Sequence, residues 1–352
     1  MKKTKSNSTD NAGKLTRREF IGGAVMLGVG ATLAGGAGNA LASMAPIPKG
    51  AAATVPTLTI SDPGAFKILQ VTDIHMHFLA KGILGEPGKV KALQAMAAAF
   101  KPDIIVNTGD FWATVSGAAQ VDNAKGCTKE IVKMKTPWAF AWGNHDESID
   151  YAQTHEMMET APYSLYRGGA ADGNYRIEVR AKDGAAPVWN LIILNNSRGG
   201  FKPEQIDWFN AEAGRIKKET PASPPAFLFF HIPIPQYEDV ALSGKAVGVK
   251  FEKVCHENGS RDALPAFKKA GFVKATFCGH DHVNDYHGVM DGIRLQYGRA
   301  LGGYGEDKVR KGASLITVDT VAKTFETKSV FEDGTSVVYD KFIQKPEPGK
   351  IY

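Results

Sequence analysis

From about residue 65 onward, short apolar runs alternate with longer segments of helical periodicity. Short apolar runs bounded by Gly, Pro or Asp have the length of buried strands, whereas apolar positions three and four apart over ten or more residues indicate amphipathic helices. The strands expected on this ground are residues 66–71, 104–107, 138–142, 175–179, 188–195, 227–230 and 274–278. The helices expected are residues 89–100, the second half of 119–135, the segment that follows Pro203, and 263–270.

The last part of the chain changes to apolar runs separated by short turns. The runs 286–289, 293–297, 314–318 and 325–330 are typical of antiparallel hairpins. Residues 233–261 have little periodicity, and a loop of that length is usually functional or disordered. Strand–helix alternation followed by hairpins predicts two stacked sheets with helices outside, in the α/β or α+β class.

The first 42 residues differ from the rest. Four lysines and the pair Arg17-Arg18 precede a Gly/Ala-rich apolar segment that ends in Ala40-Leu41-Ala42. This pattern is typical of an export signal, and the paired arginines resemble a twin-arginine signal. We therefore expect a cleaved signal at 1–42, a linker at 43–64 and one domain at 65–345, with the mature protein periplasmic or secreted. An uncleaved membrane anchor is the alternative, because the apolar segment is nearly of spanning length.

The charge of the whole chain comes mostly from this leader. The chain of 352 residues has a formal net charge of +5, but residues 1–42 contain six basic and two acidic residues, a net of +4. The remaining +1 gives no reason to expect nucleic acid as a partner, or stable membrane insertion after the signal is removed. With 43% hydrophobic and 22% charged residues, the chain as a whole is typical of a globular protein.

The chain contains three cysteines. An exported protein meets an oxidising compartment, where a disulfide can form. Cys278 lies in an apolar run and is expected to be a buried thiol. Cys127 and Cys255 lie in polar surroundings and are the better pair, although spacing cannot fix connectivity.

Five expected strand ends are followed by side chains that can bind metal ions or move protons. Ligands bind at the carboxyl ends of strands in open α/β sheets, so these side chains can converge on one edge. A single histidine at a strand end is usually an ordinary polar residue. Five such ends with the same donor types indicate one shared site. The candidates are Asp73, His75, Asp110, Asn144, His145, Asp146, His231, His280 and His282.

These residue types suit a pair of metal ions. Oxygen and imidazole donors without neighbouring cysteines favour manganese, iron or zinc. Two such ions about 3.5–4 Å apart hold the attacking and leaving oxygens of a phosphoryl displacement. A shared carboxylate should come from a loop of its own, as Asp110 does. Arg198 and Arg299 are candidate substrate-binding residues, because guanidinium groups bind phosphate bidentately, or they are ordinary surface arginines.

The order of these motifs resembles the calcineurin-like metallophosphoesterase superfamily over residues 66–300. Three further segments resemble its branch of small enzymes related to purple acid phosphatases. This resemblance implies a four-layer αββα sandwich of two mixed β-sheets flanked by helices. The motifs are Asp73-x-His75, Gly109-Asp110, Gly143-Asn144-His145-Asp146, His231 and Gly279-His280-Asp281-His282, and the three segments are residues 71–78, 205–209 and 299–304.

The resemblance also implies a role for each candidate. It makes His145 the proton donor, or the group that steadies the phosphate, with Asp146 orienting it. Purple enzymes place a metal-binding tyrosine where this chain has Ala113, so we expect no tyrosinate colour, and the metals stay open among Mn, Fe and Zn. One metal would be bound by Asp73, His75, Asp110 and His282, and the other by Asp110, Asn144, His231 and His280.

We therefore predict an exported metal-dependent phosphoric ester hydrolase that cleaves small phosphomonoesters through a metal-bound hydroxide. Its other expected partner is the twin-arginine export machinery. The first alternative is a phosphodiesterase acting on cyclic nucleotides or glycerophosphodiesters. A non-catalytic metal- or ligand-binding protein on the same scaffold should lack metal ligands or His145, and all of these residues are present. A surface adhesion role would need a repeat, and none is evident in the sequence.

Overall fold

The structure, a computed structural model, describes residues 55–79, 82–83, 87–184 and 186–352. The expected signal and most of the expected linker therefore lie outside the described residues. The chain divides into two compact units, residues 1–46 and 47–352, and the elements described here belong to the second. Among its described residues, no helix has both the length and the apolar character needed to cross a membrane.

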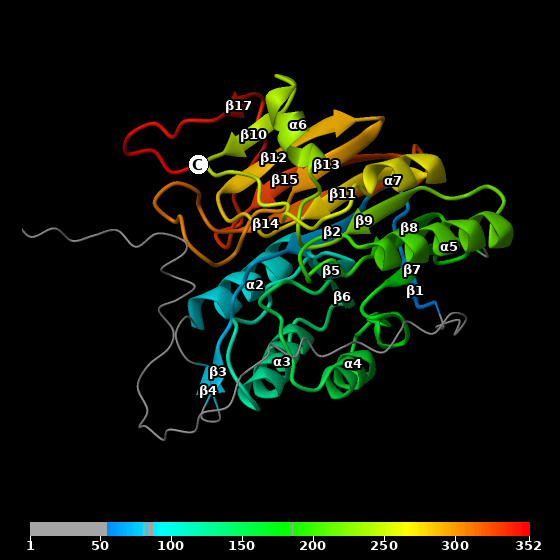
Figure 1. Cartoon of the computed structure of the whole chain (residues 1–352), viewed down its shortest axis with the longest axis horizontal. Coiled ribbons are helices and arrows are strands. Elements are labelled where there is room, and N and C mark those ends of the chain that lie inside the picture. The colour runs from blue at the N-terminus through cyan, green and yellow to red at the C-terminus, as the bar shows by residue number, and fades with distance from the viewer. Residues whose placement is uncertain (1–54, 80–81, 84–86, 185) are drawn as a thin grey trace, which may run out of the picture. The chain divides into compact units, whose positions relative to one another are not determined.

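Two mixed sheets form the inner layers of this unit (Figure 1). Over the described residues, the larger sheet has nine strands in the order β1-β7-β8-β9-β11-β13-β12-β10-β17 and the smaller has six in the order β16-β15-β14-β2-β5-β6. The larger contains β1 (Thr57–Ile60), β7 (Tyr175–Ala181), β8 (Trp189–Ile193), β9 (Ala226–Phe229), β10 (Val247–Lys250), β11 (Val273–Cys278), β12 (Asn284–Met290), β13 (Ile293–Tyr297) and β17 (Phe342–Ile343). The smaller contains β2 (Phe66–Val71), β5 (Ile104–Asn107), β6 (Trp138–Phe140), β14 (Ala313–Asp319), β15 (Thr324–Val330) and β16 (Ser336–Val337). A separate short pair joins β3 (Phe78–Leu79) to β4 (Gly82–Ile83).

Helices cover the outer faces of both sheets. They form two groups: in Figure 1, helices α2, α3 and α4 lie beside β5 and β6, whereas α5 and α7 lie together next to β9. The first group is α2 (Pro87–Phe100), α3 (Ala119–Val132) and α4 (Tyr151–Thr160), with the short 3₁₀ helix η1 (Gly169–Ala171) close to α4. The second group is α5 (Pro203–Glu219), α6 (Gln236–Leu242), which packs on β12 and β13, and α7 (Leu264–Ala270).

Alternate side chains of the central strands enter two different cores. Leu191 and Phe227 belong to the core that also contains the apolar residues of the smaller sheet. Ile192 and Leu228, one position further along the same strands, pack with Phe209 of α5 in a second core. Successive side chains of a strand point to opposite faces, so a strand covered on both faces is apolar throughout. The predicted four-layer αββα sandwich is thus confirmed.

Several elements were not foreseen in the sequence. Strand β1 lies inside the segment expected to be a linker, and it pairs in parallel with β7. Helix α6 and strand β10 lie inside residues 233–261, which we expected to be a loop, so that expectation is wrong for these parts. Both elements are short, and a short element carries too few apolar positions to establish a period.

Two helices were obscured by polar residues on their buried faces. Helix α3 begins at Ala119 rather than in the middle of its segment. Its first half was not recognised in the sequence, because the residues buried on its inner side include the polar Gln120 and Asn123. The amide of Asn123 accepts a hydrogen bond from the Phe78 N–H and donates one to the Ala113 carbonyl. Helix α4 was not predicted from the sequence, and its buried residues include the polar Thr154 and His155. Hydrophobic periodicity finds a helix only when its buried face is apolar.

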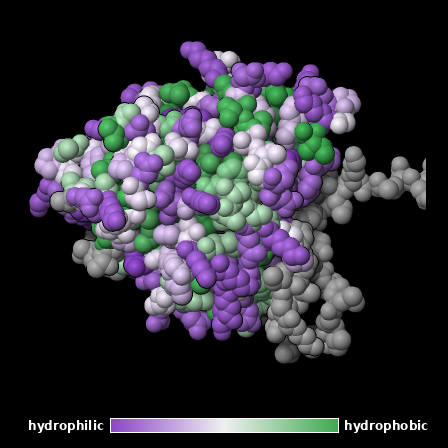
Figure 2. All heavy atoms as spheres, turned by 180° about the vertical axis from the view of Figure 1, so that it is seen from behind, coloured by the Kyte–Doolittle hydropathy of each residue, from purple (hydrophilic) through white to green (hydrophobic). Residues whose placement is uncertain are grey.

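Exposed apolar side chains are dispersed over several elements. Leu242 at the end of α6, Val289 on β12 and Val321 after β14 are more than half exposed. On the face shown in Figure 2, hydrophobic residues are interspersed with hydrophilic ones. Single exposed apolar residues are normal on protein surfaces and indicate no partner by themselves.

Candidate active site

The predicted donor residues follow the carboxyl ends of five strands in two sheets. Strands β2, β5 and β6 are parallel neighbours in the smaller sheet, and β9 and β11 are parallel neighbours in the larger. The two sheets therefore bring their carboxyl ends to one place. Asp73 and His75 follow β2, Asp110 follows β5, Asn144 and His145 follow β6, His231 follows β9, and His280 and His282 follow β11.

Four residues in these loops have a left-handed backbone conformation, which residues with a side chain rarely adopt. Asp73, His75, Asp110 and His280 all have positive φ, between 51° and 79°. Left-handed backbone in non-glycine residues costs free energy, and it clusters at functional sites. Gly143 lets the β6 loop approach closely, since a Cβ there would lie 2.2 Å from the Asp110 nitrogen. The glycine of the Gly-Asn-His-Asp motif is therefore required by contact with the neighbouring loop.

One group of donor atoms converges around His231. Its Nε2 lies 3.0 Å from Oδ1 of Asn144 and 3.2 Å from Oδ2 of Asp110. Nδ1 of His280 lies 3.3 Å from the same Nε2. These are the four residues that the family resemblance places on one metal ion. Three of them, Asp110, His231 and His280, form a buried cluster whose ligand atoms lie within 4.8 Å of one another.

A second group shares the same carboxylate oxygen. Nε2 of His75 lies 3.6 Å from Oδ2 of Asp110 and 3.2 Å from Nε2 of His282. Nε2 of His282 in turn lies 3.4 Å from Oδ1 of Asp73. Oδ2 of Asp110 thus faces both groups, which is the arrangement expected of a carboxylate that bridges two ions. The structure brings together all seven predicted metal ligands.

The hydrogen bonds behind these donors fit metal ligation. Nδ1 of His231 lies 2.8 Å from the Thr108 carbonyl, so this nitrogen donates and Nε2 is left to face the centre. The backbone N–H of His280 donates to the Asp73 carboxylate at 3.0 Å. Two imidazole nitrogens that face each other at 3.2 Å, as in His75 and His282, require a proton or a cation near them. The donor set and its surroundings therefore fit a dinuclear metal centre.

Electrostatics in the centre also indicate a demand for positive charge. Burial alone would raise the pKa of Asp110, but the charge and hydrogen bond of His231 hold it well below its ordinary value. Burial alone would lower the pKa of His231, but Asp110 raises it to about 10. Burial lowers the pKa of His75 to about 3, so this imidazole is neutral. A buried carboxylate that holds a proton on a neighbouring imidazole can hold a cation in its place.

His145 lies at the edge of this centre, and its partner is not the predicted one. Its ring meets the His75 ring edge-on, with centroids 4.9 Å apart. Its Nδ1 lies 2.8 Å from Oγ1 of Thr114. Asp146 instead accepts hydrogen bonds from the backbone N–H groups of Trp112 and Gly143. The contacts of Asp146 that position His145 are therefore with the backbone of these two segments, and the ring itself pairs with Thr114.

Arg299 is enclosed by protein partners rather than presented to the donor cluster. Its side chain is fully buried. Its Nε donates to Asp285 at 2.8 Å, and its Nη1 donates to the carbonyls of Arg310 and Tyr352. The prediction of a phosphate-binding role is corrected to a structural one. The sequence could not predict the structural role of Arg299, because the residues that bind its guanidinium come from segments that are brought together only by the fold.

Arg198 is exposed, and its guanidinium lies 4.8 Å from the centroid of the Tyr151 ring. Tyr151 in turn packs against Trp142, two residues before the ligand Asn144. The structure shows no contact between Arg198 and the clustered donors, so its role in binding substrate stays a prediction.

The cysteine prediction is also corrected. Cys127 and Cys278 are buried free thiols, so Cys127 is not joined to Cys255 by a disulfide. Cys127 lies on the buried face of α3, where its thiol approaches the Phe111 carbonyl at 3.7 Å. It is therefore in the core rather than on a polar surface beside Cys255. Its polar neighbours Asn123 and Thr128 are buried on the same helix and form hydrogen bonds inside the fold, which is why the polar sequence misled the prediction.

Two further residues support the site and were not foreseen. Asn196 accepts hydrogen bonds from the backbone N–H groups of His231 and Ile232 and donates to the Ile232 carbonyl, so it fixes the loop after β9. Thr114 contacts His145, as described above. Both lie close to predicted strand ends, but a lone Asn or Thr in a loop is too common to indicate a role.

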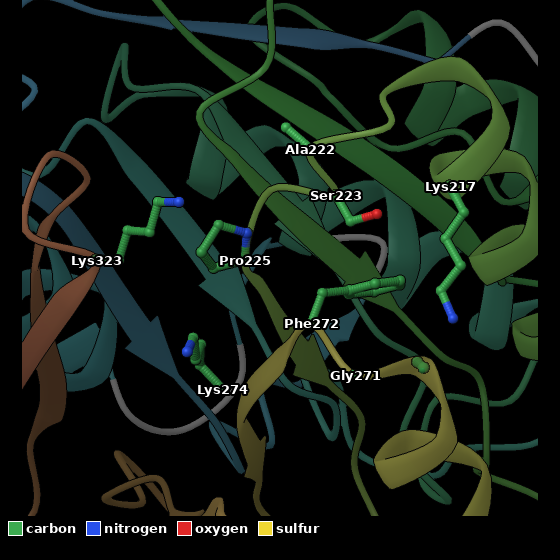
Figure 3. A pocket seen from close by; sticks show the side chains of 9 residues that line it. Lys217, Ala222, Ser223, Pro225, Gly271, Phe272, Lys274 and Lys323 are labelled. Atoms are coloured by element: carbon green, nitrogen blue, oxygen red, sulfur yellow. The ribbon is translucent and has the colours of Figure 1, made fainter.

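A separate pocket lies at the opposite end of the larger sheet. Its volume is about 380 Å³, and residues at the amino-terminal ends of β9 and β11 form part of its lining (Figure 3). The lining includes Lys217, Lys274 and Lys323. The donor groups follow the carboxyl ends of the same two strands, so this pocket is not part of the metal centre.

The fold and the donor set together define a metallophosphoesterase. The calcineurin-like phosphoesterase family matches residues 66–284, more than half of the chain, and the chain belongs to this family.

Individual relatives agree with this placement. The chain is 29% identical to "Probable inactive purple acid phosphatase 29" from Arabidopsis thaliana, over 80% of this chain and 83% of the relative. It is 26% identical to "Phosphatase DCR2" from Saccharomyces cerevisiae, over 64% of this chain and 45% of the relative.

Solved structures show the same fold. A dimetal phosphatase from Danio rerio superimposes with a TM-score of 0.51 at 12% identity, over 79% of this chain and 100% of the other. A purple acid phosphatase from yellow lupin (Lupinus luteus) seeds gives a TM-score of 0.51 at 13% identity, over 81% of this chain and 55% of the other.

Proposed function

We propose that this protein is a metal-dependent phosphoric ester hydrolase that acts on phosphomonoesters. The observation that carries the proposal is Oδ2 of Asp110, which faces both donor groups at 3.2 Å and 3.6 Å. A carboxylate oxygen shared in this way suits two neighbouring cations, and His145 stands beside them on the less buried side. Two cations when bound supply a Lewis-acid clamp for the phosphoryl group and its attacking oxygen.

Different residues of this chain bind the cations, transfer a proton and exclude water. Asp73, Asp110 and the four imidazoles of the two groups would hold the cations. The Asn144 amide supplies a neutral oxygen and so limits the negative charge of the site. His145 carries a proton to the leaving oxygen, because its ring lies beside the donor cluster and its Nδ1 pairs with the Thr114 hydroxyl, which leaves Nε2 for the substrate. The buried rings of Trp112 and Trp142, 5.6 Å apart, keep water from the back of the β6 loop.

The names of the relatives differ on whether those proteins are active phosphatases. Three plant relatives are named probable inactive purple acid phosphatases, whereas the yeast relative is named a phosphatase. The names describe those proteins. In this chain the seven expected metal ligands and His145 are all present and lie close together, which favours activity.

The test is turnover of purified protein loaded separately with Mn²⁺, Fe²⁺ and Zn²⁺. We expect hydrolysis of p-nitrophenyl phosphate and slower or no hydrolysis of bis(p-nitrophenyl) phosphate. Activity on the diester alone would replace the monoester proposal with the phosphodiesterase. Stoichiometric metal binding without turnover of either ester would indicate a non-catalytic binding protein.

We also propose export by the twin-arginine route, with the mature protein in the periplasm or outside the cell. The support is the sequence of residues 1–42 alone. That route carries folded proteins, so the metals could be inserted before transit. Changing Arg17 and Arg18 to Lys should leave the protein in the cytoplasm, as measured by cell fractionation. Continued export of the double variant would overturn the proposal.

A further inference from the structure

We propose that Thr114 is the positioning residue that holds His145 in place for proton transfer. This inference rests on the proposed function and assigns to a neutral hydroxyl the part that the sequence had suggested for Asp146. The contact is direct, with Oγ1 of Thr114 lying 2.8 Å from Nδ1 of His145.

The contact determines which ring nitrogen can meet a substrate. Hydroxyl groups both donate and accept, so Thr114 can pair with Nδ1 whether or not that nitrogen carries the hydrogen. In either case Nδ1 is occupied, and Nε2 is the nitrogen left to reach the leaving oxygen. The His145 ring lies edge-on to His75 and close to the shared Asp110. A phosphoryl group bound between the donor groups would therefore lie next to the His145 ring.

The backbone before Thr114 is fixed on both sides. The Ala113 N–H donates to the Met76 carbonyl at 3.0 Å, and the Ala113 carbonyl accepts from the buried Asn123 amide at 3.1 Å. These bonds tie the segment to the loop after β2 and to helix α3. Thr114 itself is exposed, but its main chain has little freedom to move away from the site.

Asp146 holds the two halves of the contact in register. One of its oxygens accepts the Trp112 N–H at 3.0 Å, two residues before Thr114. The other accepts the Gly143 N–H at 2.8 Å, two residues before His145. The carboxylate thus bridges the segment that carries the hydroxyl and the turn that carries the imidazole. The backbone N–H of His145 is held in addition by Oδ1 of Asp110 at 2.9 Å.

The chemistry makes the inference measurable. A poor leaving group, such as an alkoxide, needs a proton as its bond to phosphorus breaks, whereas p-nitrophenolate leaves as a stable anion. A residue that acts through His145 should therefore matter more for an alkyl phosphate than for p-nitrophenyl phosphate. A residue that only supports the fold should affect both substrates equally.

The experiment compares Thr114→Val, which removes the hydroxyl and keeps the shape, with Thr114→Ser, which keeps the hydroxyl. Thr59→Val on the exposed face of β1 is the matched control. We expect Thr114→Val to lower kcat for an alkyl phosphate roughly tenfold, the effect of about one lost hydrogen bond. The loss for p-nitrophenyl phosphate should be smaller, with KM, metal content and melting temperature unchanged. Thr114→Ser should restore most of the rate.

A double-variant cycle completes the test. In a His145→Ala background, Thr114→Val should cause no further loss, because the two residues act as one unit. Equal losses for both substrates, an additive loss in the His145→Ala background, or an unaltered rate in Thr114→Val would each overturn the inference. Absence of turnover in the metal-loaded wild type would instead overturn the proposed function, so the two failures are distinguishable.

Discussion

At the scale of single residues, the site depends on side chains that share partners. Asp110 illustrates this, since one oxygen faces both donor groups and the other accepts the His145 N–H. His231 is similarly fixed from both sides, by the Thr108 carbonyl and by Asp110. Substitutions here should separate metal binding from proton transfer, because the donors and His145 make different contacts.

Replacing His145 with Ala should leave the metal centre intact and lower kcat on the order of 10²–10⁴-fold, the usual contribution of a general acid. The reason is that His145 is the one imidazole of the site paired with a side-chain hydroxyl rather than with another donor. Steady-state kinetics and elemental analysis of the same preparation provide the check. A variant with full metal content and unchanged kcat would remove His145 from the reaction.

Replacing Arg299 with Met should destabilise the fold without changing substrate binding. The substitution leaves the Asp285 carboxylate buried without its partner, and breaking such a pair costs about 3–5 kcal/mol. Chemical denaturation measures the loss. The exposed Arg198→Met serves as the control and should change stability by less than about 0.5 kcal/mol. A large rise in KM with unchanged stability in Arg299→Met would restore its substrate-binding role.

At the scale of elements, the site is carried by strands whose helices hold the outer layers in place. Helix α5 shows the principle, because Phe209, Ala213 and Ile216 lie on its buried face and pack in the second core. Pro203 occupies its first turn, where the missing N–H has no intrahelical partner to lose. None of the donor residues lies on α5, so a substitution in its buried face should lower the free energy of unfolding and leave the donor cluster unchanged.

Replacing Phe209 with Ala should lower the free energy of unfolding by about 3–5 kcal/mol, the cost of a large cavity in a packed core. Its ring packs edge-on against Phe267 of α7 at 5.0 Å, so the loss loosens two helices. Urea denaturation measures the change, and Asn210→Ala on the exposed side of the same helix is the control. If kcat of the folded variant fell in parallel, α5 would have a part in the site that its contacts do not show.

At the scale of the whole molecule, the cluster of predicted metal ligands joins the two sheets. Two strands of the larger sheet and three of the smaller contribute donors, and the centre therefore ties both inner layers together. Carboxylates and imidazoles concentrated in this way are stabilised by cations that bind only the folded protein.

Removing the metals with a chelator should lower the melting temperature by several degrees. Ligand binding at a concentration about 1,000 times Kd stabilises a folded protein by about 4 kcal/mol. Calorimetry with and without the chelator gives the shift, and restoring the metal should reverse it. A melting temperature independent of metal would contradict a centre that joins the sheets.

The sequence by itself determined the class of fold and the set of donors. Apolar runs such as 66–71 and 104–107 bury both of their faces, so their pattern reports their environment directly. The donors could be found because each follows a strand end and is of a type that binds metal. The glycines beside them, such as Gly143, mark the close approach of loops that the structure shows.

Only the tertiary structure decided which side chains meet. The partner of His145 is Thr114 rather than Asp146, and the partner of Arg299 is Asp285 rather than a substrate. Helix α3 and the buried Cys127 were obscured because polar side chains such as Asn123 satisfy their hydrogen bonds inside the fold. A sequence pattern records the burial and chemistry of single positions, whereas hydrogen bonds between distant segments depend on geometry that exists only once the layers have packed.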